Sequence, residues 1–524
     1  MSGHAGRPGL GARIRDALSA QMTDPPKDGP TLDAKLLLGT LGLVLFALVY
    51  YIDERLAAVG NVDLTGNLGQ GNDEGSWIST AYTLGQVLVI PMTPWLGTIF
   101  SFRTMAIVLI CIATISAALL TTTSHYGSVV ALRLLQGVGE GGSVPLMLGH
   151  FLSRLPKYRL IEALVAYGLV ITVPVLTTFS LDGLAANLSS WLELFGAAPI
   201  VGPVALGLVV FGLEKQPPKW EMFHNADFFG LFSLTASVAA LVVACSQGQR
   251  LDWFDSGFID ALFAMSAWFA VCFVANTLLR EKPLYTFKTF AKINFSIGLV
   301  EITLFAVSLL GVGTLFPQEQ AEIRFLRPLQ IGNTTLVLLL PVVAVAAMLP
   351  FVLRRIDARL VLATGLFLVS LGAWLSIWVS PEWAGLDYRT SLELQATGWL
   401  MVIVTNALLT TGVLGPEDSL TGSAMFNLMR TIGFAVGGAV ITGILTVRDR
   451  VHGNANIVRN LDPGREPVRV LVEARGTGAL SMLQSEQARV MAYADSWAWL
   501  AIAVCVALFL SLLLQPAKVT RPPG

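Results

Sequence analysis

Long apolar runs separated by short polar loops are the feature that most constrains this chain. Runs of about 18–25 residues recur between residues 36 and 514, and a helix of about 20 apolar residues crosses the hydrocarbon core of a bilayer. Within each run the apolar residues are continuous rather than alternating, which is typical of helices and not of barrel strands. Only 13% of the 524 residues are charged, against about 25% in soluble chains. This pattern excludes a soluble enzyme, a nucleic-acid-binding protein and a disordered protein.

Hydropathy predicts an all-α polytopic membrane protein with fourteen transmembrane helices. The predicted segments are 36–60, 76–97, 104–122, 127–150, 160–183, 190–213, 227–246, 257–279, 293–316, 334–353, 358–379, 394–414, 420–446 and 496–514. One long polar loop, 447–495, has a helical pattern over 465–493. We interpret it as a small helical hairpin outside the membrane, either a plain connector or a docking surface for a periplasmic adaptor protein.

The distribution of Lys and Arg in the short loops predicts the orientation of the chain. If the N-terminus is inside, thirteen of these residues lie in inside loops and four in outside loops. Residues 1–30 are polar and lack the apolar stretch of a cleavable signal. We therefore expect a multi-pass protein of the cell (inner) membrane, surrounded by the lipid bilayer, with both termini in the cytoplasm.

The fourth segment carries the most informative polar residues. Arg133, Gln136, Gly137 and Glu140 stand at i, i+3, i+4 and i+7, so they share one helical face. A charged residue at the centre of a membrane helix costs about 2.5–3.5 kcal/mol by insertion scales, so this face is expected to look into a cavity or onto a neighbouring helix. Two interpretations stay open: an Arg133–Glu140 pair that holds helices together, or a role in coupling ions or substrate.

Three other segments carry ionisable groups inside the membrane. Asp53 is intramembrane if the first helix runs to about residue 60, and interfacial if that helix ends early. Glu301 lies near mid-depth with no Lys or Arg on its helix, which suggests a proton carrier or a protonated hydrogen bond between helices. Asn427 and Arg430 share a face that belongs in the bundle interior, as a charge relay or as a helix contact.

The remaining candidates for chemistry are scattered. The five histidines fall on tails, loops and span ends without metal-ligand spacing, and the four cysteines lie inside apolar runs. The glycine-rich stretch 137–142 lacks the Lys-Ser/Thr that follows a phosphate loop. Asp182 and Glu193 are expected at the outer interface. We therefore expect no enzyme activity, no metal, no cofactor and no nucleic-acid partner, and either an ion gradient or the substrate's own gradient as the energy source.

Four stretches, taken together, resemble a known family: DERLAA at 53–58, GSWISTAY at 75–82, RLLQGVGEG at 133–141 and SAMFNLMRTIG at 423–433. They are similar to the major facilitator superfamily, in its fourteen-span drug:proton antiporter branch of the EmrB/QacA type. The resemblance implies two six-helix bundles with two inserted central helices. It divides the chain into a cytosolic N-tail (1–34), an N-terminal bundle (35–213), an inserted pair with its flanking loops (214–292), a C-terminal bundle (293–515) and a cytosolic C-tail (516–524).

The resemblance also implies proton-coupled efflux of small amphipathic compounds by alternating access. Asp53 matches the first-span aspartate of the family, Arg133 and Gln136 match its span 4 motif, and Arg430 matches its span 13 arginine. The candidate proton-coupling residues are Asp53, Glu140 and Glu301, and Arg133 would tune the pKa of a nearby carboxylate. The candidate cavity residues, chosen by polarity and depth, are Tyr82, Gln86, Trp399 and Asn406.

Departures from the family pattern keep an alternative open. The loop between spans 2 and 3, PWLGTIFSFR at 94–103, keeps only Arg103 of the expected gating residues. The antiporter motif of span 5 is replaced by VPVLTTFSLDG at 173–183. This second change favours a facilitator or uptake carrier of the same fold that is not coupled to protons. The loop between spans 10 and 11 keeps more of the gating residues, namely Arg354, Arg355, Asp357 and Arg359.

Overall fold

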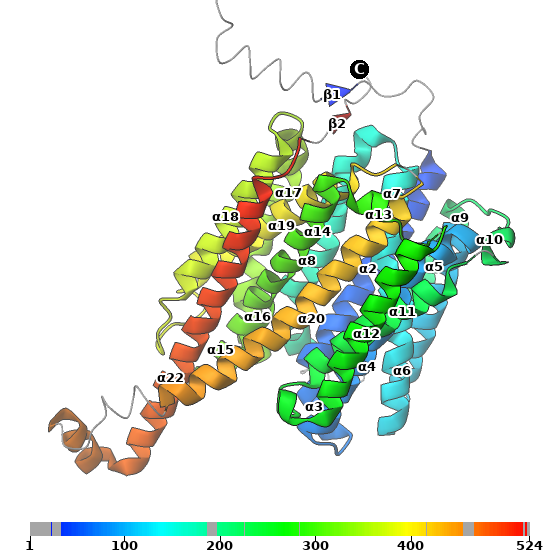
Figure 1. Ribbon diagram of the computed structural model, residues 1–524. Helices are drawn as coiled ribbons and strands as arrows, with labels where there is room; N and C mark the ends of the chain where they lie inside the picture. Colours follow the sequence, from blue (N-terminus) through cyan, green and yellow to red (C-terminus); the bar gives the residue numbers. More distant parts are fainter. Residues whose placement is uncertain are drawn as a thin grey trace, which may run out of the picture.

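The computed structural model describes residues 22–23, 33–185, 196–224, 226–281, 283–415, 417–453, 466–516 and 519–520. Most of the predicted N-tail, Glu193 and residues 454–465 of the long loop lie outside the described residues. The described chain is almost entirely helical. Its one sheet is a parallel pair of two-residue strands, β1 (Met22–Thr23) and β2 (Val519–Thr520). This pair lies beyond one end of the helices, so the two ends of the described chain are on the same side (Figure 1).

The helices follow one another with short connections. The N-terminal part contains α2 (Ala34–Val59), α3 (Asn61–Asn67), α4 (Asn72–Val89), η1 (Ile90–Met92), α5 (Thr93–Leu120), α6 (Tyr126–Gly141), α7 (Ser143–Arg154), η2 (Lys157–Arg159), α8 (Leu160–Ala185) and α9 (Ala197–Gly212). The central part contains α10 (Glu221–His224), α11 (Phe228–Gln247), η4 (Trp253–Asp255), α12 (Gly257–Leu279) and α13 (Phe287–Phe290). The C-terminal part contains α14 (Ile293–Leu310), η5 (Gly311–Leu315), α15 (Phe316–Glu322), α16 (Pro328–Val337), α17 (Leu339–Leu353), α18 (Ala358–Ser376), α19 (Arg389–Thr411), α20 (Ser419–Val451) and α22 (Glu466–Ser511).

Eleven helical segments of the described chain are long and apolar enough to cross a membrane. One of them, Asp73–Leu120, covers two of the predicted segments. Predicted span 4 is divided at Gly142 into α6 and α7, and α9 has only 16 residues. Each of the fourteen predicted ranges overlaps a described helix. The predicted segments and the eleven long helical segments therefore differ in where helices are continuous and in how long they are.

Local backbone breaks explain where the predicted boundaries differ. Ser101, with φ 75° and ψ 157°, separates the helical turns that follow η1 from the rest of α5. Predicted span 9 does not end at residue 316: it continues through the π-helical turn η5 into α15 and reaches Glu322. A π turn holds one extra residue per turn, and hydropathy does not register it.

The predicted helical hairpin in the long loop is wrong as a separate unit. Residues 466–511 form one helix, α22, that runs on into the last predicted span. Likewise α20 continues to Val451, beyond the predicted end of span 13. The end of α20 meets the middle part of α22 at the side of the molecule opposite the two strands (Figure 1). There Asp495 pairs with Arg448 and lies 2.7 Å from the ring nitrogen of His452.

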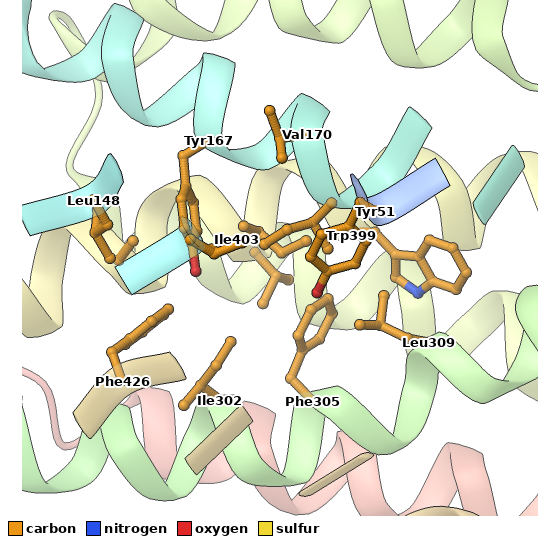
Figure 2. Close-up of a cluster of buried hydrophobic side chains, with 14 of the residues drawn as sticks. Tyr51, Leu148, Tyr167, Val170, Ile302, Phe305, Leu309, Trp399, Ile403 and Phe426 are labelled. Atoms are coloured by element: carbon orange, nitrogen blue, oxygen red, sulfur yellow. The ribbon is translucent and has the colours of Figure 1, made fainter. Parts of the chain in front are cut away.

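An apolar cluster joins the N-terminal and C-terminal helices. Figure 2 shows Tyr51 of α2, Leu148 of α7 and Tyr167 of α8 packed against side chains of α14, α19 and α20. The labelled C-terminal members are Ile302, Phe305, Leu309, Trp399, Ile403 and Phe426. All of these side chains are buried. Because lipid tails are as apolar as these side chains, close packing rather than escape from water holds such helices together.

Glycines allow close contacts between helices. A Cβ on Gly137 of α6 would collide with the carbonyl oxygen of Tyr82 on α4. A Cβ on Gly433 of α20 would collide with the carbonyl oxygen of Thr303 on α14. The first of these contacts brings Tyr82 close to the polar face of α6.

Candidate functional site

A cavity of about 300 Å³ lies where N-terminal, central and C-terminal helices meet. Its walls come from α2, α4, α6 and α7, from α11, and from α20. Its charged and amide-bearing lining side chains are Glu54, Arg55, Gln86, Glu140, Gln249, Asn427 and Arg430. Both signs of charge therefore face one space, which suits ligands that combine polar and apolar parts.

The polar face predicted for span 4 forms a continuous hydrogen-bonded chain. Arg133 donates to the side-chain oxygen of Gln136 at 2.7 Å, and the Gln136 amide donates to the Glu140 carboxylate at 2.9 Å. The hydroxyl of Tyr82 donates to the other carboxylate oxygen of Glu140 and accepts from Gln86 at 3.0 Å. The Arg133 guanidinium lies 4.2 Å from the centre of the Tyr82 ring. Three members of this series of hydrogen bonds line the cavity: Glu140, Tyr82 and Gln86.

Asp53 is fully buried, because α2 continues to Val59. This position excludes the alternative in which the first helix ends early. Neither carboxylate oxygen of Asp53 has a hydrogen-bond partner of ordinary geometry among the described residues. The groups that interact electrostatically with the Asp53 carboxylate are the positively charged Arg133 and the backbone of Ala198. Asp53 therefore lies behind the cavity wall, while its neighbours Glu54 and Arg55 line the cavity.

Arg430 forms the opposite wall of the cavity. Its guanidinium donates to the hydroxyl of Tyr51 and to the side-chain oxygen of Asn427, the latter at 3.5 Å. The same oxygen of Asn427 accepts from Tyr167 of α8 at 3.0 Å. Arg430 and Asn427 thus share a face, as the sequence predicts, and they link α20 to two N-terminal helices. A contact between a cation and an aromatic ring also links α2 to α20, because the Arg55 guanidinium lies 4.8 Å from the centre of the Phe434 ring.

Glu301 lies away from the cavity, inside the C-terminal helices. One of its carboxylate oxygens accepts from the Asn406 amide at 2.8 Å, and the other has no hydrogen-bond partner among the described residues. Thr410 donates to the oxygen of Asn406 at 3.2 Å. Glu301 and Asn406 therefore form a contact between α14 and α19.

Two of the four predicted cavity residues do not line this cavity. Tyr82 and Gln86 line it, whereas Asn406 and Trp399 are fully buried between C-terminal helices. Trp399 lies in the apolar cluster, and Figure 2 shows its indole beside Leu309. Polarity and depth cannot distinguish a cavity wall from a helix contact, because both require the residue to avoid lipid.

The predicted gating residues separate into three groups. Arg354, directly after α17, pairs with Glu162 of α8 and so connects the C-terminal helices to the N-terminal helices. Asp357 and Arg359 pair with each other at 2.7 Å. Arg355 is exposed, and Arg103 lines a second pocket near the start of α2.

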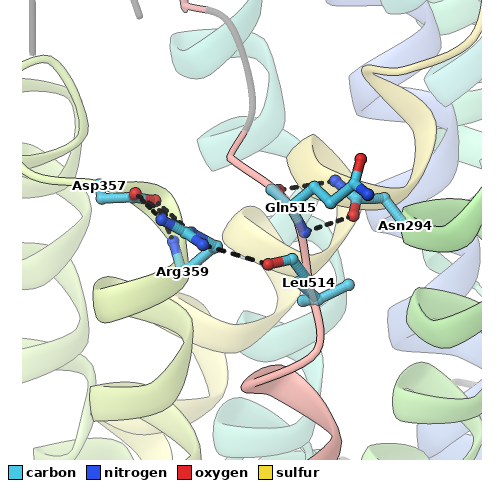
Figure 3. A network of polar contacts seen from close by, with 5 residues as sticks. All are labelled: Asn294, Asp357, Arg359, Leu514 and Gln515. Carbon is cyan, nitrogen blue, oxygen red and sulfur yellow. Dashed lines mark hydrogen bonds and ion pairs between the residues drawn. The ribbon is translucent and has the colours of Figure 1, made fainter. Parts of the chain in front are cut away.

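The Asp357–Arg359 pair secures the end of the last span rather than a contact between halves. Arg359 donates to the carbonyl of Leu514 at 3.2 Å. The next residue, Gln515, exchanges two backbone hydrogen bonds with the side chain of Asn294, at 2.7 and 2.8 Å (Figure 3). All of these groups belong to C-terminal helices or directly follow them.

Several buried polar groups are not indicated by the sequence pattern. Glu319 of α15 is buried and accepts a hydrogen bond from Tyr388 at 2.5 Å, but it lies beyond the predicted end of span 9, where the helix continues into α15. Asp182, expected at the interface, is buried, and so is His150 at the end of span 4. Among the described residues, no three His, Cys, Asp or Glu side chains are grouped as metal ligands.

Comparison with known proteins gives consistent matches over most of the chain. A family model described as Major Facilitator Superfamily matches residues 43–438. The colistin resistance protein EmrB of Acinetobacter baumannii is 21% identical over 516 residues, which are 96% of this chain and 99% of that protein. The multidrug export protein EmrB of Escherichia coli is 23% identical over 448 residues, covering 83% of this chain and 85% of that protein. The solved structure of the proton:xylose symporter XylE matches with a TM-score of 0.57 at 11% identity, over 93% of this chain and 98% of that chain, and shows the likeness of the fold.

Proposed function

This chain belongs to the major facilitator superfamily, and from that premise we propose that it exports small amphipathic organic compounds in exchange for protons. Two of its relatives are named for colistin resistance and for multidrug export, and the matches extend over most of each chain. The observation that carries the proposal is the cavity between the halves, with Glu140 on one wall and Arg430 on the other.

We place the chain in the inner membrane with fourteen crossings and both termini in the cytoplasm. In this arrangement α4 and α5 supply two crossings, α6 with α7 one, and the short α9 one. The N-terminal bundle is 35–213, the inserted pair α11 and α12 lies within 214–292, and the C-terminal bundle is 293–515. The excess of Lys and Arg in the inside loops supports this orientation, as does the position of both ends of the described chain on one side.

The cavity is the proposed substrate site. Its aromatic and apolar walls, which include Tyr51, Val144 and Phe434, suit the apolar part of an amphipathic compound. Glu54 and Arg55 offer charge to the polar part. A binding site between two halves becomes accessible from either side in turn when the halves rock against each other.

The proposed proton carriers are Asp53, Glu140 and Glu301. A carboxyl group in a buried position has a different desolvation cost with and without its proton, so protonation biases the equilibrium between two access states. Arg133 connects two of the three carriers, because its charge acts on Asp53 and its hydrogen bonds lead through Gln136 to Glu140. Arg133, Gln136, Asn427 and Arg430 are therefore proposed as the groups that relay charge between substrate and proton sites. No cofactor is required, since the proton gradient supplies the energy.

The proposed gate at the cytoplasmic side is the contact between Arg354 and Glu162. It joins the loop after α17 to the start of α8, so it must open when the halves separate at that side. Arg355 and Asp357 lie in the loop after α17, Arg359 lies in the first turn of α18, and Arg103 lies in α5. The remaining proposed partner is a periplasmic adaptor protein, for which the projecting start of α22 offers a surface (Figure 1).

The test is transport by the purified protein in sealed vesicles. A lipophilic fluorescent cation is the substrate probe, and a pH gradient is imposed across the vesicle membrane. We expect the probe to accumulate against its own gradient, and the accumulation to vanish when an ionophore dissipates the pH gradient. Probe flux that ignores the proton gradient would contradict export coupled to protons and would indicate a facilitator. A variant that removes both Asp53 and Glu301 but keeps gradient-driven accumulation would exclude these two residues as carriers.

A further inference from the structure

A second cavity, of about 350 Å³, lies near the membrane surface on the side of the two termini. It is formed by the start of α2, the bend of α5 at Ser101, the end of α7 and the residues after α9. Three cations line it: Lys35, Arg103 and Arg154. We call this cavity the basic pocket. The transport route described above does not use this pocket, and of its residues only Arg103 is also a gating candidate.

The cations of the basic pocket are not neutralised by ion pairs within the part of the chain that the structure describes. Two carboxylates, Asp33 and Glu214, also line the pocket. Asp33 caps α2 by accepting from the backbone N–H of Ala34 at 2.7 Å, and Glu214 is exposed. The Arg154 guanidinium lies 5.9 Å from the centre of the Phe102 ring, and this contact helps to position the Arg154 side chain.

His150 supplies an independent indication that a ligand binds here. The side chain lines the basic pocket, is only 1% exposed, and its Nδ1 atom has no hydrogen-bond partner among the described residues. Its other ring nitrogen, Nε2, lies 3.1 Å from the hydroxyl oxygen of Thr40. A buried polar atom without a partner costs free energy unless a ligand or water satisfies it.

The hydrogen bonds around Thr40 determine which ring nitrogen carries the hydrogen. The Thr40 hydroxyl donates to the carbonyl of Leu36 at 2.7 Å, so towards His150 its oxygen accepts. The Nε2 atom of a neutral His150 ring therefore carries the hydrogen, and Nδ1 is a bare acceptor. A ligand that completes this site presents a hydrogen-bond donor to Nδ1 and negative charge to Arg103 and Arg154.

We propose that the basic pocket binds a phosphodiester group that carries a hydroxyl donor, with the phosphate on Arg103 and Arg154 and the hydroxyl on His150. Arginine favours phosphate oxygens through paired N–H donors, and basic pockets at this depth between membrane helices suit lipid headgroups. The same chemistry is offered by a glycerol-type phospholipid headgroup and by soluble glycerol phosphodiesters. Because the pocket joins α2, α5, α7 and α9, an occupant stabilises the N-terminal bundle.

The test measures the unfolding temperature of the purified full-length protein in detergent with four additions. These are short-chain phosphatidylglycerol, short-chain phosphatidylcholine, glycerophosphoglycerol and inorganic phosphate. Phosphatidylcholine has the phosphate but no N–H or O–H donor in its headgroup, so it tests the role of His150. We expect phosphatidylglycerol to raise the unfolding temperature of the wild type by a few degrees, and phosphatidylcholine to raise it less. An equal rise with glycerophosphoglycerol supports the proposal with a soluble ligand as the source.

Variants separate this pocket from general lipid effects. Arg103→Gln and Arg154→Gln should lose the rise, and His150→Phe should lose the preference for phosphatidylglycerol over phosphatidylcholine. Lys157→Gln, which removes an exposed cation outside the pocket, should keep both. Equal stabilisation of the wild type by both lipids, or no stabilisation by any addition, would overturn the proposal even if the variants fail to fold. A rise that survives in both Arg103→Gln and Arg154→Gln would also overturn it.

Discussion

In the N-terminal helices Glu140 shares its helix face with a cation, whereas in the C-terminal helices Glu301 has only an amide as its partner. The Arg133–Gln136–Glu140 chain connects charges of both signs within one helix. Among the described residues Glu301 accepts a hydrogen bond from Asn406, and Arg430, the cation predicted inside the C-terminal bundle, faces the cavity instead. The N-terminal charges are thus compensated locally, while the C-terminal ones are separated, and the two halves should respond differently when a charge is removed.

The largest expected effect on stability comes from Arg133→Leu. Removing one partner of a buried charged set leaves the others uncompensated, which costs about 3–5 kcal/mol. Arg430→Leu should cost less, because Arg430 lines the cavity and its partners Tyr51 and Asn427 are neutral. The unfolding temperature in detergent measures both. Equal losses for the two variants would show that the halves do not differ in this way.

Asp53→Asn should have the largest effect on transport with little effect on folding. The amide keeps the shape of the side chain but cannot exchange a proton, so accumulation driven by a pH gradient should fall to background. Exchange of labelled for unlabelled probe at equal pH should persist, because it requires no net proton movement. Asp182→Asn is a matched control, since Asp182 is also a buried aspartate but is not one of the proposed proton carriers. Full gradient-driven accumulation in Asp53→Asn would contradict the assignment.

At Glu301, two substitutions distinguish a hydrogen bond from a proton carrier. Glu301→Gln retains an oxygen that accepts from Asn406, so its free energy of unfolding should stay near that of the wild type. Glu301→Leu leaves the buried Asn406 amide without its acceptor, at a cost of about 1–3 kcal/mol. Urea unfolding in mild detergent compares the two. If Glu301→Gln keeps both stability and proton coupling, Glu301 serves only as a helix contact.

The smallest expected effect on stability comes from the Arg354–Glu162 contact. These side chains are 25% and 32% exposed, and ion pairs near the surface contribute only about 0–1 kcal/mol. Glu162→Gln should therefore change the unfolding temperature little but alter the transport rate, because the contact joins helices that must separate. Glu393→Gln, which breaks the Arg389–Glu393 pair within α19, should change neither. Identical transport by both variants would remove Glu162 from the gate.

The polar face of α6 could be predicted from the sequence because helix periodicity alone places Arg133, Gln136 and Glu140 together. The membrane helices themselves were also predictable, apart from the breaks at Ser101 and Gly142, because each crossing needs a minimum length of apolar sequence.

Features that depend on contacts between distant segments could not be predicted. Whether Trp399 and Asn406 face a cavity or a neighbouring helix depends on how α19 is rotated, and nothing local in the sequence sets this rotation. Glu319 is buried because the helix of span 9 continues through η5 into α15, beyond its predicted end. Glu162 becomes important only through its partner Arg354, which lies 192 residues away in the sequence.

Labelling of single cysteines tests most directly whether the cavity between the halves, which Glu140 and Arg430 line, is hydrated. In a background with the four native cysteines replaced by alanine, Thr431→Cys places a thiol on the cavity wall and Leu309→Cys places one in the apolar cluster. We predict that a membrane-impermeant maleimide modifies Thr431→Cys in sealed vesicles and leaves Leu309→Cys unmodified. Equal modification of both thiols, or an unreactive Thr431→Cys, would contradict the account.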